Sequence, residues 1–153
     1  MTDKEIRTIM APLKNGYAML PASAVAEVMN FTSPKPLKQA PVWLLGELAW
    51  HGWQVPVISY ERLMNTDGNE STTSKARILI IKTLGESTLV NYIGLVIQGL
   101  PRLKKVSAVT LVEKQTGTLP ETVFSEVSID DLQAVIPRLG KLTRIVEQAA
   151  YDK

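Results

Sequence analysis

The sequence predicts a mainly β protein, folded as one small barrel or a pair of small barrels and ending in a helical tail. Short apolar runs rich in β-branched residues recur from residue 6 to residue 127, punctuated by glycine, proline and asparagine. Such short strands with frequent turns are typical of small barrels. Helical periodicity is scarce before residue 128 and sustained after it. At 153 residues, the chain is predicted to form a single domain with a sizeable core over residues 1–153.

The first half is predicted to contain five strands and one short helix. Asn15-Gly16 is a turn signal between the first two strands, and Pro21 opens a short helical or turn segment before the third. Three prolines in residues 32–41 indicate an ordered surface loop before the fourth strand. The predicted strands cover residues 6–10, 17–20, 25–28, 46–50 and 54–59, and residues 60–64 are predicted to form a helical turn.

The second half begins with residues 65–76, which are polar and contain almost nothing that a core could use. This segment is predicted to be flexible. Two apolar, β-branched runs follow at residues 77–82 and 92–97, and their composition predicts central strands of a sheet. Shorter strands are expected at residues 102–106 and 122–127.

A helical tail is predicted over residues 129–151. Ser128 followed by Asp131 has the spacing of a capping box, with aspartate in place of the usual glutamate. Pro137 is expected to end or kink the first helix. A second helix from about residue 138 has an apolar stripe formed by Leu139, Leu142, Ile145, Val146 and Ala149.

The composition excludes several kinds of chemistry. No cysteine is present, which excludes disulfides and thiolate metal sites and suits a reducing cytoplasm. A single histidine, His51, excludes a multi-histidine metal site, and we expect neither a metal nor a cofactor. The net charge of +2 gives too weak a field for a dedicated nucleic-acid-binding protein. No apolar stretch is long enough for membrane insertion, so a cytoplasmic protein is expected.

His51 is the main candidate for acid–base catalysis, and it lies between Trp50 and Trp53. His51-Gly52 fits a two-residue hairpin loop, in which a histidine is more often structural than catalytic. No serine elbow, phosphate-binding loop or zinc-protease motif is present, so we predict no catalytic residues and no enzymatic activity. The same loop would place Trp50 opposite Trp53, where the rings are expected to stack and contact a partner.

The segment from Tyr17 to Leu63 resembles the CheW-like domain, a coupling adaptor of bacterial chemosensory systems. The matching runs are residues 17–21, 25–28, 40–48, 50–52 and 55–58. A looser resemblance continues through residues 93–99 and 127–130, so that most of residues 6–136 is covered. Within the family, the sequence looks closest to adaptors of the chemosensory system that controls type IV pilus twitching.

The resemblance implies two intertwined SH3-like β-barrels with a hydrophobic groove between them and no enzymatic activity. It implies a protein that bridges the tip of a chemoreceptor hairpin to the regulatory domain of a CheA-type histidine kinase. Carried over by position, the receptor contacts are Ala22, Val25, Glu27, His51 and Gly99. The kinase contacts carried over in the same way are Phe31, Gly46, Glu47 and Leu48.

The sequence departs from the family pattern at four polar positions. The family's turn asparagine and arginine are Ala49 and His51 here, and its two strand aspartates are Ser59 and Gln98. Because polar groups set specificity between related partners, these changes indicate a diverged adaptor. The region between residues 113 and 127 is also shorter than in the family, which would remove or reduce one strand.

Glu27 enters two geometric predictions. Val25 and Glu27 are two residues apart on one strand, so both should point to the same side and border the groove. In the family the turn arginine lies near the acid of this strand, so His51 should approach Glu27 here. Imidazole is shorter than guanidinium and lacks its fork, so the pair should be looser.

The residues by themselves leave two other function classes open. One is a β-barrel module that binds nucleic acid or a small ligand, although the tryptophan-rich segment contains no arginine or lysine between residues 39 and 61. The other is a small enzyme, which would need a convergent polar pocket around His51.

Overall fold

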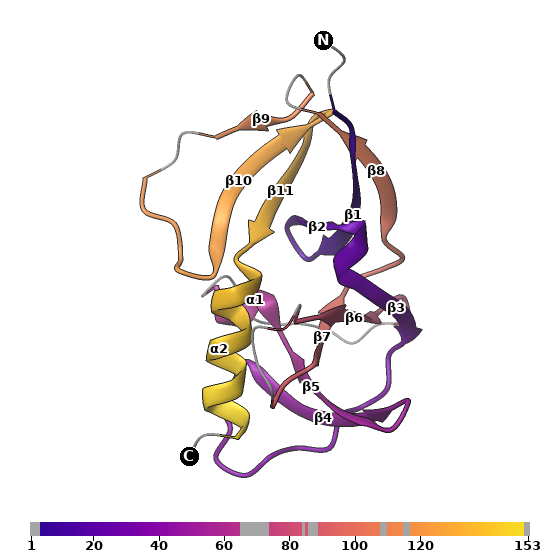
Figure 1. Cartoon of the computed structure of the whole chain (residues 1–153), viewed down its shortest axis with the longest axis vertical. Helices are drawn as coiled ribbons and strands as arrows, with labels where there is room; N and C mark the ends of the chain where they lie inside the picture. The colour runs from indigo at the N-terminus through magenta and orange to yellow at the C-terminus, as the bar shows by residue number, and fades with distance from the viewer. Residues whose placement is uncertain are drawn as a thin grey trace.

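The computed structural model describes residues 4–64, 74–83, 85, 89–107, 110–114 and 117–151. Two β-sheets form two small barrels, one above the other in Figure 1, and a C-terminal helix lies along their left side. We refer to these as the upper and the lower barrel. The predicted mainly β fold with two barrels and a C-terminal helix is therefore confirmed.

The upper barrel is built from both ends of the chain. Its six strands lie in the order β8-β1-β2-β11-β10-β9, so the first two strands pair with the last four. All neighbours are antiparallel except β2 and β11, which run parallel. The strands are β1 (Ile6–Leu13), β2 (Gly16–Pro21), β8 (Arg102–Val106), β9 (Val112–Glu113), β10 (Val123–Ile129) and β11 (Leu132–Pro137).

The lower barrel contains the middle of the chain. Its five strands lie in the order β3-β6-β7-β5-β4, so β3 and β4 are the two edges of the sheet. A 3₁₀ turn, η1 (Ala22–Ala24), leads into β3, and helix α1 (Tyr60–Leu63) follows β5. The strands are β3 (Val25–Asn30), β4 (Leu44–Trp50), β5 (Trp53–Ile58), β6 (Arg77–Lys82) and β7 (Tyr92–Ile97).

Three apolar clusters form the core of the protein. One fills the upper barrel, one fills the lower barrel, and the third lies between the two sheets and joins them. The sequence of strand β6 is apolar from Ile78 to Ile81 because both faces of the strand are buried. Ile78 and Ile80 point into the lower barrel, whereas Leu79 and Ile81 point into the cluster between the sheets. A strand buried on both faces has no polar side, as predicted for a central strand.

Helix α1 connects the lower barrel to the upper one. Its N-cap is Ser59, whose hydroxyl accepts a hydrogen bond from the Arg62 amide at 3.2 Å. The first helical residue, Tyr60, is 1% exposed, and its hydroxyl donates to the Thr122 carbonyl at 2.8 Å, just before β10. Burial raises the pKa of the Tyr60 phenol.

The prediction of a helical tail from residue 129 is wrong over its first nine positions, 129–137. Strands β10 and β11 form a hairpin there, with Asp130 and Asp131 at its tip, and both have positive φ. Ser128 is therefore a strand residue and caps no helix. Along β10, Val127 and Ile129 are buried while Ser128 between them is half-buried, so the packing follows the two-residue period of a strand.

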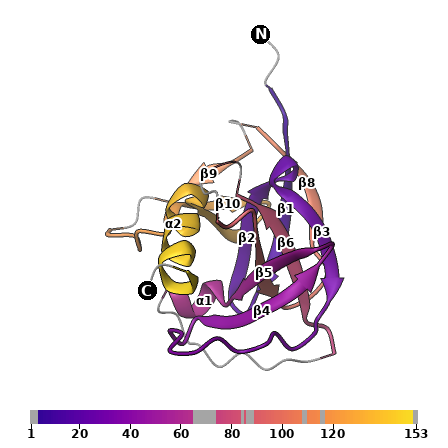
Figure 2. The same ribbon diagram turned by 60° about the horizontal axis from the view of Figure 1, so that its bottom comes forward.

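The second half of the predicted tail is helical. Helix α2 (Leu139–Ala150) begins just after Pro137 and buries Leu142 and Val146 in the cluster between the sheets. Figure 2 shows α2 beside α1, with its C-terminal end directed toward β4. Its basic residues Lys141 and Arg144 are exposed, as expected for the solvated face of an amphipathic helix.

Two other predictions concern loops. The predicted flexible segment, residues 65–76, lies outside the described residues except for 74–76, so its flexibility stays a prediction. A strand was expected to be missing or reduced between residues 113 and 127. The 2-residue β9 ends at Glu113, and among the described residues of this region the next strand is β10, which begins at Val123.

Candidate functional site

Glu27 lies where the two edge strands of the lower barrel meet. Its Oε2 accepts a hydrogen bond from Trp50 Nε1 at 3.0 Å, and its Oε1 lies 3.5 Å from His51 Nε2. Glu27 is on β3, whereas Trp50 ends β4, so these contacts close the sheet into a barrel. We call the three residues the Glu27 cluster. The predicted approach of His51 to Glu27 is confirmed, and the 3.5 Å separation fits a loose pair.

The Glu27 cluster is open to solvent. The side chains of Glu27 and His51 are 42% and 67% exposed, so a partner can reach both. His51 and Gly52 have φ of 47° and 81°, and Trp50 pairs with Trp53 across them. The predicted two-residue hairpin loop is therefore confirmed.

The two tryptophans contact a third ring that the sequence analysis missed. The rings of Trp50 and Trp53 both meet Tyr92 of β7 edge-on, with centroid distances of 4.8 Å and 5.5 Å. Trp53 remains 43% exposed, which leaves an aromatic surface beside the Glu27 cluster. The run of tryptophans predicted an aromatic site, but Tyr92 lies on a different strand and no local pattern marks it.

The prediction that Val25 and Glu27 share one side of their strand is wrong. Val25 is paired with Ile81 and Glu27 with Ile80, because a bulge at Ala26 shifts the register. Ile80 and Ile81 are successive residues of β6 and point to opposite faces of the sheet. Val25 therefore packs against the cluster between the sheets, whereas Glu27 points to the mouth of the lower barrel.

The remaining predicted receptor contacts, Ala22 and Gly99, lie where the sheets meet. Ala22 belongs to η1, which packs against β1. Gly99 follows β7, and a Cβ there would meet Pro12 of β1 at 3.5 Å. Next to it, Gln98 Nε2 is buried without a hydrogen-bond partner among the described residues, at a position where the family has an aspartate. The predicted receptor residues are thus divided between this junction and the Glu27 cluster.

The predicted kinase contacts differ widely in accessibility. Gly46 and Leu48 are buried, and Leu48 belongs to the core of the lower barrel. Phe31 is half-buried and packs against the same core. Glu47 is half-buried, and its Oε2 accepts a hydrogen bond of 2.5 Å from the hydroxyl of Tyr151. Of the four, Glu47 and Phe31 therefore have side chains that a partner can touch.

Tyr151 ties the C-terminal end of α2 to this strand. Burial, reinforced by the neighbouring Glu47 carboxylate, raises the pKa of the Tyr151 phenol. The backbone of Glu47 is also occupied, because its amide and carbonyl both bond to Lys35. Neither contact was predicted from the sequence. Tyr151 is 104 residues from Glu47, and Lys35 lies outside the strands in the loop before β4.

A pocket of about 250 Å³ lies apart from the predicted contact residues, between α1 and the β10–β11 hairpin. Its walls are mainly apolar and include Leu13, Met64 and Val123. Glu61, which is 3% exposed, also lines it and accepts a hydrogen bond from the Lys14 amide at 3.1 Å.

The described part of the chain contains no cluster of three or more histidine, aspartate or glutamate side chains able to hold a metal ion. None of its helices is long and apolar enough to cross a membrane.

Comparison with known proteins places this architecture in a family. Residues 7–147 match the family described as the CheW-like domain, which covers most of the chain and both barrels. The chain belongs to this family. No curated protein matches the sequence.

Among solved structures, the fold is similar to the scaffolding protein TtCheW from Thermoanaerobacter tengcongensis. The TM-score is 0.74 and the sequence identity is 18%, over 88% of this chain and 90% of that one. The two SH3-like barrels are therefore shared by chains whose sequences have diverged widely.

Proposed function

We propose that this protein is a non-enzymatic adaptor that couples a chemoreceptor to a CheA-type histidine kinase in the cytoplasm. The observation that carries the proposal is the match to the CheW-like domain over residues 7–147. The similarity to a scaffolding protein of the same two-barrel fold supports it. The pathway we propose is the one that controls type IV pilus twitching, because the sequence looks closest to adaptors of the ChpC type.

The Glu27 cluster is the proposed receptor contact. It combines an exposed carboxylate, an exposed imidazole and, beside them, the aromatic surface of Trp53. Exposed aromatic groups next to charged groups are typical of the residues that dominate binding energies at interfaces. The residues at the sheet junction, Ala22, Val25 and Gly99, would line the neighbouring part of the receptor groove.

A pull-down separates the receptor contact from folding. We expect Glu27→Lys to weaken binding to a receptor hairpin at least tenfold while binding to the kinase regulatory domain is unchanged. Glu113→Lys on β9 is the matched control, because it makes the same charge change at an exposed position on the upper barrel. If the two variants lose receptor binding equally, or if kinase binding falls as well, Glu27 is not a receptor contact.

Glu47 and Phe31 are the proposed kinase contacts on the lower barrel. Reversing the charge with Glu47→Arg should weaken kinase binding several-fold and leave receptor binding intact. Tyr151→Phe breaks the hydrogen bond to Glu47 but keeps its carboxylate, so kinase binding should persist in that variant. Unchanged kinase affinity in Glu47→Arg would mean that Glu47 is not part of the kinase contact.

Binding of a small ligand is the alternative function, and the pocket beside α1 is the observation that favours it. Apolar walls with a few polar groups are typical of ligand sites. A thermal-shift screen against a library of small amphipathic molecules tests it. Stabilisation that disappears in Val123→Trp, which fills the pocket, would support this alternative over the adaptor.

A further inference from the structure

Strand β8 is an unpaired edge of the upper barrel. In the sheet order β8-β1-β2-β11-β10-β9 it pairs only with β1, along residues 102–106. Both Figure 1 and Figure 2 show it on the outside of the molecule, with no other described element beyond it. An edge strand presents unpaired amides and carbonyls, which are a template for another extended chain.

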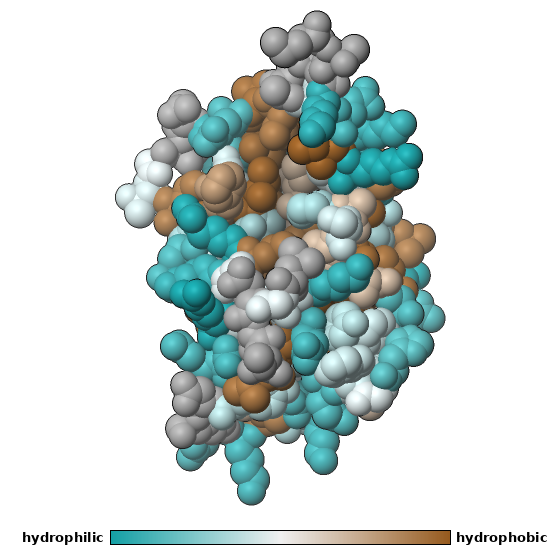
Figure 3. All heavy atoms as spheres, viewed as in Figure 1, coloured by the Kyte–Doolittle hydropathy of each residue, from teal (hydrophilic) through white to brown (hydrophobic). Residues whose placement is uncertain are grey.

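The surface of this edge is basic and apolar. Arg102 and Lys105 of β8 and Arg7 of β1 are exposed, and Leu103 next to Arg102 is 59% exposed. None of these three cations takes part in an ion pair among the described residues. Figure 3 shows the hydrophilic side chains gathered at the upper right, where Figure 1 places β8.

Two of these cations are placed against each other. Arg7 and Lys105 are directly opposite partners in the β1–β8 ladder. Like charges at such positions destabilise a sheet, and an anionic group nearby would relieve the repulsion. Glu5, just before β1, forms no ion pair among the described residues, and the Asp130 carboxylate is paired with Lys104.

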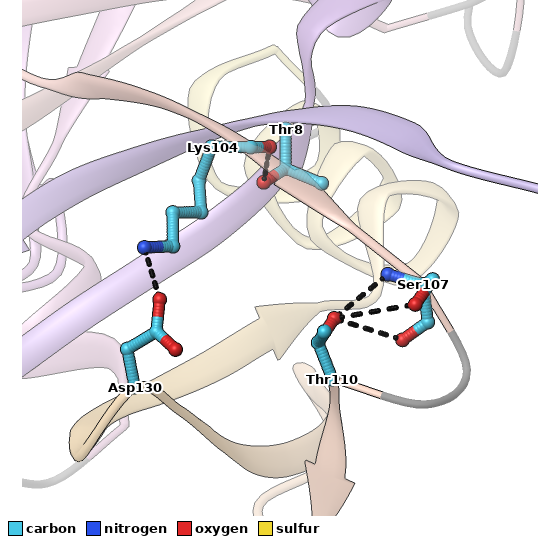
Figure 4. Close-up of polar contacts among 5 residues, drawn as sticks. All are labelled: Thr8, Lys104, Ser107, Thr110 and Asp130. Atoms are coloured by element: carbon cyan, nitrogen blue, oxygen red, sulfur yellow. Dashed lines mark hydrogen bonds and ion pairs between the residues drawn. The ribbon is translucent and has the colours of Figure 1, made fainter.

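Polar contacts also tie strand β8 to its neighbours, as Figure 4 shows. The buried Thr8 hydroxyl donates to the Lys104 carbonyl at 2.8 Å, and the Lys104 ammonium is paired with Asp130 at the β10–β11 tip. The turn after β8 is closed by Ser107 and Thr110, with the Ser107 amide bonded to the Thr110 hydroxyl at 3.0 Å. A strand fixed in this way loses little entropy when another strand is added to it.

We propose that the edge of β8 binds an acidic, extended segment of a partner protein, which adds to the upper barrel as a further strand. Backbone hydrogen bonds to β8 would supply affinity, and acidic side chains beside Arg102 and Lys105 would supply selectivity. An apolar side chain of the segment would cover Leu103. This site lies on the upper barrel, so it is separate from the proposed Glu27 contact.

A peptide that places glutamate opposite Arg102 and Lys105 and valine opposite Leu103, long enough to cover the 5 residues of β8, is a direct probe. We expect binding, measured by fluorescence anisotropy, together with slowed amide hydrogen exchange confined to β8. A peptide of the same sequence carrying backbone N-methyl groups keeps every charge but loses its donors, so it should bind at least tenfold more weakly. A lysine–valine peptide should not bind.

Protein variants test the charges. Lys105→Glu should weaken binding of the glutamate peptide about tenfold. Arg144→Glu, on the exposed face of α2, makes the same charge change and should leave this binding unchanged. Equal binding of the N-methylated peptide, equal binding of single-stranded DNA, or protection outside β8 would each overturn the proposal. Absence of any binding would also overturn it, since the basic residues would then only protect the edge from aggregation.

Discussion

Glu27 has two roles that a single substitution confounds. Its carboxylate accepts the Trp50 indole hydrogen bond inside the barrel seam, and it also presents an exposed charge beside His51. Because the two contacts join opposite edges of one sheet, any change at Glu27 alters the closure of the lower barrel as well as its surface charge. Measurements of binding at this position therefore need stability measurements beside them.

A double-mutant cycle in urea measures the structural part. Glu27→Gln and Trp50→Phe should each lower the free energy of unfolding by about 1 kcal/mol, the usual net contribution of one hydrogen bond. Since both remove the same interaction, the double variant should lose about 1 kcal/mol less than the sum of the two single losses. Trp53→Phe changes an indole without touching Glu27 and should show no coupling to Glu27→Gln. Strict additivity of the first pair would mean that the seam contact contributes nothing.

Residues close in sequence were easier to predict than residues brought together by the fold. The His51-Gly52 loop follows from two adjacent residues, and the approach of His51 to Glu27 was inferred through the family's pairing. Tyr92 and Tyr151 contact the predicted sites from distant strands and helices, where no spacing rule applies. The contacts between neighbouring residues of the candidate site were thus predicted, whereas the contacts made by residues distant in sequence were missed.

Elements were predicted well where the burial period was unambiguous. The apolar run of β6 is buried on both faces, and the stripe of α2 faces the core. The hairpin of β10 and β11 was misread as helix, because Ser128 and Asp131 have capping-box spacing while Val127 and Ile129 have strand spacing. The segment forms a strand because this conformation buries both Val127 and Ile129 in the upper barrel. The bulge at Ala26, which separates Val25 from Glu27, leaves no mark in the sequence.

There is no space for a side chain at Gly46 of β4. Its φ is +146°, and a Cβ there would lie 2.2 Å from the Lys35 carbonyl oxygen. Lys35 exchanges both backbone hydrogen bonds with Glu47, so the loop has no freedom to withdraw. Gly46→Ala should therefore cost about 3 kcal/mol or more in urea unfolding.

Gly52 is the matched control for Gly46. It also has positive φ, at +81°, but nothing lies within 4 Å of the added Cβ. Gly52→Ala should therefore cost only the backbone strain of about 1 kcal/mol. Similar losses in the two variants would show that close approach to Lys35 is not what fixes a glycine at position 46.

At the scale of the whole molecule, the two barrels are joined because the chain crosses between them. The strands of the upper barrel come from the first and last parts of the chain, and those of the lower barrel come from the part between them. The cluster between the sheets takes residues from both, and α1 and α2 pack against it. Thr122 is a further link, because its carbonyl accepts hydrogen bonds from both the Tyr60 hydroxyl and the Arg138 amide.

The stability of this link should depend on pH. Burial raises the pKa of Tyr60 above the ordinary phenol value of about 10, so the folded state keeps a proton that the unfolded state releases. Stability from this residue is therefore complete below about pH 10 and falls as pH rises above it, by up to about 1.4 kcal/mol for each pH unit. Tyr60→Phe should cost about 1 kcal/mol at neutral pH, because Thr122 keeps its bond from Arg138, yet should flatten the alkaline loss.

Urea unfolding at several pH values between neutral and strongly alkaline, with wild type and Tyr60→Phe side by side, checks this expectation. Lysine and arginine titrate in both proteins, so the difference between the two curves isolates Tyr60. Tyr151→Phe is the matched control, since burial also raises the pKa of Tyr151 but that side chain is 38% exposed and its effect should be smaller. Parallel alkaline slopes in wild type and Tyr60→Phe would mean that the phenol ionises without unfolding the link between the barrels.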